Sequence, residues 1–227
     1  MQKQLLLDLG TPQPPSLHDF VTGRNAEVLQ QLNAMAGRRS PDRFAYLWGE
    51  PGTGKTHLLQ SLVQTAPSRY ITPSSPLDDF SYSPEVFLYL LDDCESLPPQ
   101  KQIAAFNLFN QIRDSRTASL VTAGTCAPMA LPLRDDLRSR LCWGLVYQLH
   151  DLSDEEKLQV LAAQAQKKGL NLSPGVLPWL LSHYHRDLHS LTHILDELDH
   201  YSLQMKRMVT LPLLHDLLQK RLEQKDD

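Results

Sequence analysis

The sequence contains few cysteines, and their spacing matches neither a metal site nor a disulfide framework. The three cysteines lie far apart, at Cys94, Cys126 and Cys142, and no C-x-x-C pair occurs. A zinc site and a disulfide-stabilised scaffold are therefore not indicated. This pattern is typical of a protein that works in a reducing cytoplasm, and we expect a cytoplasmic protein.

Long hydrophobic runs and an excess of positive charge are also missing. No apolar stretch approaches the ~20 residues that a membrane-spanning helix needs, and the leucines after Met1 are too few for a signal peptide. We therefore expect no membrane partner. Lys and Arg total 22 against 26 Asp and Glu, a net charge of −4. This balance argues against a surface that mainly binds DNA phosphates.

The motifs of several hydrolase classes are absent as well. No G-x-S-x-G elbow occurs, and no pairing of Cys with His suggests a nucleophile, so acyl-transfer and thiol chemistry are not indicated. Four histidines gather towards the C-terminus, but no H-E-x-x-H pattern or carboxylate accompanies them. We interpret them as exposed helix surface; they are His183, His185, His189 and His193.

The strongest positive signal is a complete G-x-x-x-x-G-K-[ST] phosphate loop from Gly49 to Thr56. An apolar run at 44–48 precedes it and an amphipathic run at 57–63 follows, which is the strand–loop–helix order that the motif requires. Lys55 is predicted to reach the β- and γ-phosphates of ADP or ATP, and Thr56 to bind Mg²⁺. The predicted nucleotide-binding residues here are Gly49, Pro51, Gly52, Thr53, Gly54, Lys55, Thr56 and His57.

A second apolar run, at 86–91, ends in two carboxylates. We predict a central parallel strand whose carboxyl edge carries Asp92 and Asp93, at the place where α/β sheets bind their ligands. Asp92 is predicted to hold Mg²⁺, directly or through water, opposite Thr56. Asp93 is predicted to act in catalysis by orienting or activating the attacking water. A plain strand end is the alternative for both.

Two further segments are predicted to complete this part of the chain. Residues 102–113 form an amphipathic pattern with Ile103, Phe106, Phe109 and Ile112 on one side. A strand at 119–124 ends in Thr125, which is predicted to bridge the acids and the γ-phosphate, with a plain turn as the alternative.

A short predicted helix at 133–140 carries Arg134, Arg138 and Arg140. Such a group can be a solvated, salt-bridged face. The alternative is that one arginine completes the active site of a neighbouring subunit.

From residue 152 onwards the pattern is helical only. Ser153 and Glu156 form a capping box before a helix at 157–168, and further helices are predicted at about 174–184, 187–203 and 210–222. Arg186 opens the third of these helices and is predicted to reach the nucleotide, with a structural ion pair as the alternative. We predict an α/β fold with a tether at 1–18, a nucleotide-binding domain at 19–150 and a small all-helical lid at 151–227.

The first residues form a short leucine-rich segment that a proline-rich stretch at 10–16 separates from the rest. Taken alone, the pattern Gln4-Leu5-x-Leu7-x-Leu9 fits either a tail packed on its own domain or a peptide that docks on a partner.

From Asp19 onwards the chain resembles an AAA+ ATPase module. Within that group it is most similar to the family of the bacterial initiator DnaA and its short Hda-type homologues. The likeness depends on F-V-x-G-x-N at 20–25, on Y-L-W-G and G-K-T-H-L-L within 46–59, and on L-R-S-R-L-x-W-G at 137–144. These motifs add Val21 to the predicted nucleotide-binding residues. The chain stops at Asp227, which leaves no room for the helix-turn-helix domain of DnaA and favours the Hda type.

This resemblance implies a function. Gln4, Leu5, Leu7 and Leu9 match the peptide by which bacterial proteins bind the DNA polymerase III β sliding clamp, so DNA is contacted only indirectly. On the clamp, such a protein stimulates hydrolysis of DnaA-bound ATP and prevents re-initiation of chromosome replication. Arg140 matches the family's arginine finger and Arg186 its second sensor.

The resemblance also implies that the chain's own nucleotide is ADP or ATP, held as a structural ligand, with weak or absent ATPase activity. A homodimer or a higher oligomer remains open. Two alternatives stand beside this function. One is an AAA+ loader or adaptor of the helicase-loader or clamp-loader type, in which Asp92 and Asp93 run a hydrolysis cycle; the other is a passive tether stiffened by nucleotide.

Overall fold

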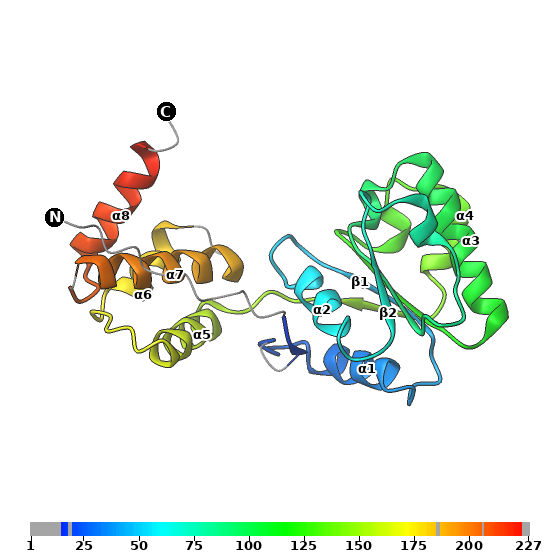
Figure 1. Cartoon of the computed structure of the whole chain (residues 1–227), viewed down its shortest axis with the longest axis horizontal. Helices are drawn as coiled ribbons and strands as arrows, with labels where there is room; N and C mark the ends of the chain where they lie inside the picture. The colour runs from blue at the N-terminus through cyan, green and yellow to red at the C-terminus, as the bar shows by residue number, and fades with distance from the viewer. Residues whose placement is uncertain (1–14, 18–19, 185–186, 206, 224–227) are drawn as a thin grey trace. The chain divides into compact units, whose positions relative to one another are not determined.

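The computed structural model describes residues 15–17, 20–184, 187–205 and 207–223 (Figure 1). These residues form two compact units. Unit 1 extends to Glu50 and resumes from Gly54 to Leu149, and unit 2 contains Pro51–Thr53 and the chain from His150 on. No helix in these described ranges is long and apolar enough to cross a membrane.

Unit 1 is built on a five-stranded sheet in the order β2-β3-β4-β1-β5, and every neighbouring pair is parallel. A purely parallel sheet is covered by helices on both faces, so its inner strands read as continuous apolar runs. This confirms the predicted α/β class. The strands are β1 (Phe44–Trp48), β2 (Ser68–Ile71), β3 (Leu88–Leu91), β4 (Ser119–Gly124) and β5 (Leu145–Gln148).

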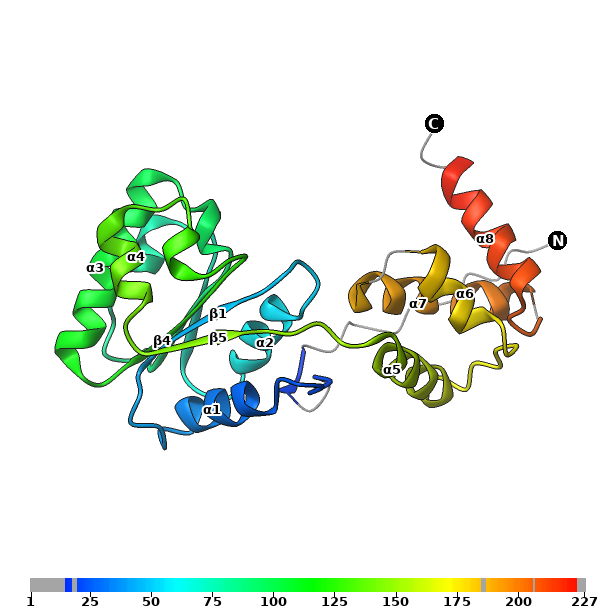
Figure 2. The same ribbon diagram turned by 180° about the vertical axis from the view of Figure 1, so that it is seen from behind.

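Helices pack on both faces of the sheet, as Figures 1 and 2 show from opposite sides. The helices α1 (Ala26–Ala36) and α2 (Lys55–Leu62) share a core with Leu47 and Leu90. On the other face, α3 (Pro99–Ser115) and α4 (Asp135–Leu141) pack against neighbouring residues such as Tyr46 and Tyr89. Alternate residues of one strand therefore enter different cores. Short 3₁₀ turns complete unit 1: η2 (Leu77–Phe80), η3 (Cys94–Ser96) and η4 (Pro128–Ala130).

The predicted inward side of α3 is partly wrong. Ile103 is 45% exposed, whereas the polar Gln102 is buried. The reason is hydrogen bonding: the Gln102 amide donates to the Leu97 carbonyl at 2.8 Å and accepts from the Arg134 backbone N–H at 3.0 Å. Because these bonds join the segments before α3 and α4, a polar side chain occupies a position that periodicity assigns to an apolar one.

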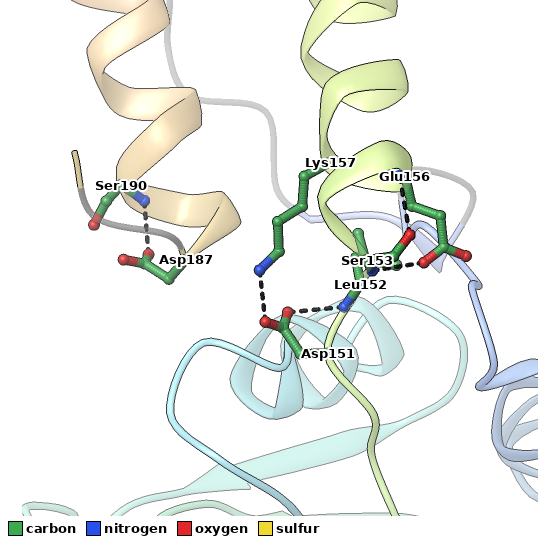
Figure 3. A network of polar contacts seen from close by, with 7 residues as sticks. All are labelled: Asp151, Leu152, Ser153, Glu156, Lys157, Asp187 and Ser190. Carbon is green, nitrogen blue, oxygen red and sulfur yellow. Dashed lines mark hydrogen bonds and ion pairs between the residues drawn. The ribbon is translucent and has the colours of Figure 1, made fainter. Parts of the chain in front are cut away.

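Unit 2 is helical, as predicted for the C-terminal part. Its helices are α5 (Asp154–Lys167), α6 (Val176–His183), α7 (Leu188–Met205) and α8 (Leu211–Glu223). The predicted capping box is confirmed: Ser153 Oγ accepts from the Glu156 N–H, and Glu156 Oε2 accepts from the Ser153 N–H (Figure 3). Asp187 caps α7 by accepting from the Ser190 N–H at 2.8 Å.

A buried lysine ties the start of α5 to the segment before it. The Lys157 side chain is 3% exposed, and its Nζ donates to Asp151 Oδ2 at 2.5 Å (Figure 3). The other oxygen of Asp151 accepts from the Leu152 N–H at 2.8 Å. The two side chains therefore fasten the chain before α5 to the body of the helix.

Replacing Asp151 with alanine should destabilise unit 2, because it leaves the Lys157 ammonium buried without its counter-ion. We expect a loss of about 2–3 kcal/mol in the free energy of unfolding, below the ~3–5 kcal/mol of a fully buried pair, since Asp151 is 51% exposed. Denaturant unfolding followed by circular dichroism measures it. Lys168→Ala removes a solvent-exposed pair with Asp196 and should cost under about 1 kcal/mol. Equal losses in the two variants would contradict the prediction.

Candidate functional site: the phosphate loop and its carboxylates

The phosphate loop joins β1 to α2, as the motif predicts. Gly52 and Gly54 have φ angles of +86° and +92°, which favour glycine because other residues are strained there. At Gly54 a Cβ atom would also lie 2.8 Å from the Phe20 ring. Phe20 packs in turn on the imidazole of His57, with ring centroids 5.9 Å apart. Val21, predicted to bind nucleotide, is partly buried and is the next residue in the chain after Phe20, which packs on the loop.

Lys55 opens α2, and its side chain is buried over its own loop. The ammonium donates to the carbonyls of Gly49 at 2.7 Å and Glu50 at 2.9 Å. Burial lowers the pKa of Lys55, and the negative charges of Glu95 and Asp92 act in the opposite direction. The amine is thus held beside carbonyls and carboxylates, and an anion bound at the loop would supply a further counter-charge.

Asp92 follows β3 and is 1% exposed. Its Oδ2 accepts from the Tyr70 hydroxyl at 2.7 Å, and its Oδ1 accepts from the Asp93 N–H at 3.0 Å. Asp93 differs from it: its side chain is exposed and its φ is +48°, in the left-handed region. The structure therefore separates the two acids that are adjacent in sequence, one buried and hydrogen-bonded, the other facing solvent.

Glu95 is a carboxylate that the sequence analysis did not single out. It lies on η3, and its Oε2 is buried without a hydrogen-bond partner among the described residues. This oxygen lies 3.1 Å from the point that a Cβ on Gly124 would occupy, at the end of β4. Thr125, the next residue, is exposed. The signal that sequence reasoning missed is an acid three residues after Asp92.

The three arginines around α4 have different surroundings. Arg134 pairs with Asp136 at 2.8 Å, and Arg138 pairs with Asp135. Among the residues that the structure describes, Arg140 forms no ion pair.

The guanidinium of Arg140 instead lies over two aromatic rings. Its carbon is 4.2 Å from the centroid of Trp143 and 5.5 Å from that of Phe106. Trp143 is itself 45% exposed. Arg140 is partly buried on an aromatic surface that fixes its position without neutralising its charge.

Several predicted site residues lie outside the described residues: Arg186, Gln4, Leu5, Leu7 and Leu9. In the described ranges, no three His, Cys, Asp or Glu side chains gather closely enough to hold a metal ion by themselves. A magnesium ion bound with a nucleotide needs no such cluster, because one carboxylate, a hydroxyl and phosphate oxygens suffice. Thr56, exposed in the first turn of α2, and the hydrogen-bonded carboxylate of Asp92 are of the oxygen type that Mg²⁺ prefers.

Comparison with known proteins supplies the family. A family model described as "Hda, lid domain" matches residues 154–218. A protein of Haemophilus influenzae, described as uncharacterized, is 34% identical over 231 residues, covering 96% of this chain and 99% of its own length. The chain belongs to the Hda-type family of DnaA-homologous AAA+ proteins.

Solved structures agree on the fold. Domain III of Thermotoga maritima DnaA matches this Hda-type chain with a TM-score of 0.78 and 24% identity, covering 90% of this chain and 95% of that one. AMPPCP-bound DnaA from Aquifex aeolicus matches with a TM-score of 0.67 and 21% identity over 80% of this chain and 64% of that one. The predicted fold class is confirmed: an α/β AAA+ module with a central parallel sheet, followed by a small helical lid.

Proposed function

We propose that this DnaA-related replication regulator binds ADP or ATP with Mg²⁺ and stimulates hydrolysis of DnaA-bound ATP through Arg140, while its first residues hold it on the sliding clamp. The observation that carries the proposal is the environment of Arg140. It is the arginine of this segment that has aromatic rings in place of a carboxylate partner.

The nucleotide site is supported by the loop geometry. Lys55 supplies a buried positive charge, Gly52 and Gly54 supply the turn, and the free N–H groups in the first turn of α2 would bind a phosphate. Thr56 and Asp92 would hold Mg²⁺, whose role is to neutralise phosphate charge. The DnaA structure with AMPPCP has the same fold, which is consistent with a nucleotide at this loop.

The proposed finger role is supported by the charge and shape of the Arg140 side chain. A guanidinium already paired with a carboxylate would lose that pair before it could stabilise a phosphate, as Arg134 and Arg138 would. Arg140 contacts aromatic faces, which cost little to leave. We propose that it reaches the γ-phosphate of ATP on a DnaA subunit and stabilises the charge of the transition state there.

Clamp docking is supported by the sequence of the first residues alone, since Gln4, Leu5, Leu7 and Leu9 lie outside the described residues. Apolar side chains on a short segment before a proline-rich stretch suit a peptide that fills a hydrophobic pocket on a partner. We propose the division 1–18, 19–150 and 151–227 for the clamp-binding tether, the nucleotide-binding domain and the lid.

Adding nucleotide should stabilise the protein against heat. At a concentration 100 times the Kd, Mg-ADP should add about 2.7 kcal/mol, equivalent to a rise of about 5–10 °C in Tm. Lys55→Ala should abolish the rise because it removes the buried ammonium beside the phosphates. Differential scanning fluorimetry measures it, with Lys167→Ala on the exposed end of α5 as the matched control. A rise that survives in Lys55→Ala would contradict the site.

A second candidate function is an ATPase of the loader or adaptor type. The observation that favours it is Glu95, one of whose carboxylate oxygens is buried without a hydrogen-bond partner among the described residues, and whose negative charge opposes the lowering of the Lys55 pKa by burial. Such a group suits a base that accepts a proton from the attacking water. Rapid turnover of ATP by the isolated chain, without DnaA, would favour this function over the first.

A further inference from the structure

Tyr70 lies beside Asp92 because the edge strand β2 pairs with its inner neighbour β3. In the parallel β2–β3 pair, Tyr70 is opposite Leu90, so Asp92 is its diagonal neighbour, two residues further along. The Asp92 N–H donates to the Ile71 carbonyl at 2.9 Å, which extends the ladder by one residue. Because side chains alternate along a strand, Tyr70, Leu90 and Asp92 lie on the same face, towards α2.

The hydroxyl of Tyr70 is one of two hydrogen-bond donors to the Asp92 carboxylate. It donates to Oδ2 at 2.7 Å, while the Asp93 N–H donates to Oδ1 at 3.0 Å. A carboxylate has about four lone-pair sites, so one acceptor site on each oxygen is left over. Asp92 is 1% exposed, so these two donors fix the orientation of its carboxylate. Any further ligand of the carboxylate must bind to the lone pairs that remain.

We infer that Tyr70 is a positioning residue for the magnesium–nucleotide site: its hydroxyl fixes the orientation of the Asp92 carboxylate, which together with Thr56 would hold the cation. This inference rests on the proposed nucleotide site. Partners that orient a metal-binding carboxylate in this way typically change metal affinity by 10- to 100-fold when they are removed.

The hydroxyls of three other tyrosines in unit 1 provide a contrast. Tyr46 donates to the Cys126 carbonyl, Tyr89 exchanges hydrogen bonds with Ser83, and Tyr82 pairs with Thr117 at 2.8 Å. These contacts hold loops together and involve no carboxylate of the site. Tyr82→Phe, at a surface hydroxyl, is therefore a matched control for removing the hydroxyl of Tyr70.

The experiment compares the full chain with Tyr70→Phe, Tyr82→Phe and Asp92→Ala. Binding of a fluorescent ADP analogue is measured by anisotropy across a magnesium titration and again in EDTA. In Tyr70→Phe we expect the magnesium concentration for half-maximal tightening to rise at least about 10-fold, with the Kd in EDTA within about twofold of the wild type. Asp92→Ala should lose the magnesium response, and Tyr82→Phe should keep it.

Three results would count against the inference, and they are distinguishable. A wild-type magnesium response in Tyr70→Phe would overturn it while leaving the nucleotide site intact. An equal loss of affinity with magnesium and in EDTA, together with a lowered Tm, would show that Tyr70 only stabilises the fold. Absence of nucleotide binding by the wild type in either buffer would overturn the proposed site itself, and this inference with it.

Discussion

Replacing Arg140 with alanine should reduce the stimulated hydrolysis of DnaA-bound ATP by a factor of about 10³ or more, the scale of effect that arginine fingers have in comparable enzymes. The physical reason is that negative charge is redistributed over the γ-phosphoryl group and the leaving oxygen in the transition state, and a planar guanidinium placed there would stabilise it. The protein's own nucleotide binding should be unchanged, because Arg140 lies on α4 and not on the phosphate loop.

The measurement uses DnaA loaded with labelled ATP, the sliding clamp on DNA, and this protein, with conversion to ADP followed over time. Arg134→Ala is the matched control, since it removes an arginine next to the same helix that is already paired with Asp136. Arg140→Lys keeps the positive charge but loses the planar guanidinium that can donate two hydrogen bonds at once, and we expect most of the stimulation to be lost. Undiminished conversion with Arg140→Ala would show that the finger assignment is wrong.

Replacing Gln4 and Leu7 together with alanine should abolish retention on the sliding clamp. A leucine side chain that is fully buried in a pocket contributes about 1.5–3 kcal/mol, and the glutamine amide adds hydrogen bonds, so the pair should weaken binding by a factor of about 10² or more. Co-elution with purified clamp in gel filtration, and surface plasmon resonance on immobilised clamp, measure the effect.

Leu6→Ala is a sharp control for this prediction. Leu6 is as apolar as Leu7 but stands at a variable position of the Q-L-x-L-x-L pattern, so clamp binding should stay within about twofold of the wild type. A loss of binding as large as that of the double variant would show that general hydrophobicity, not the pattern, holds the chain. Unchanged binding by the double variant would remove the docking peptide from the proposal.

The two experiments also separate two parts of the proposed function. Arg140→Ala should remain on the clamp and fail to stimulate hydrolysis. The Gln4 and Leu7 variant should keep its finger and fail for want of a local concentration on the clamp, so raising the protein concentration should restore part of its activity. Raising the protein concentration should not restore the activity of Arg140→Ala, because that variant lacks the group that acts in the chemical step.

Much of the local structure could be predicted because it depends on residues close together in the chain. The phosphate loop is specified by its glycines and lysine, and the capping box by Ser153 and Glu156. The inward side of α3 could not be predicted in full. Periodicity does not show that Gln102 finds two backbone partners, one of them 32 residues away.

The sequence by itself determined the phosphate loop, the buried character of the strand at 86–91 and the helical nature of the C-terminal part, since each follows from motifs or periodicity within one segment. Only the tertiary structure decided which side chains complete the site. Tyr70 and Asp92 are 22 residues apart and meet because β2 and β3 are neighbours in the sheet. The surroundings of Arg140 likewise depend on packing: Trp143 is close in the sequence, but Phe106 belongs to α3 and reaches the guanidinium only because α3 packs against α4. Such contacts between segments follow strand order and packing, which no local pattern encodes.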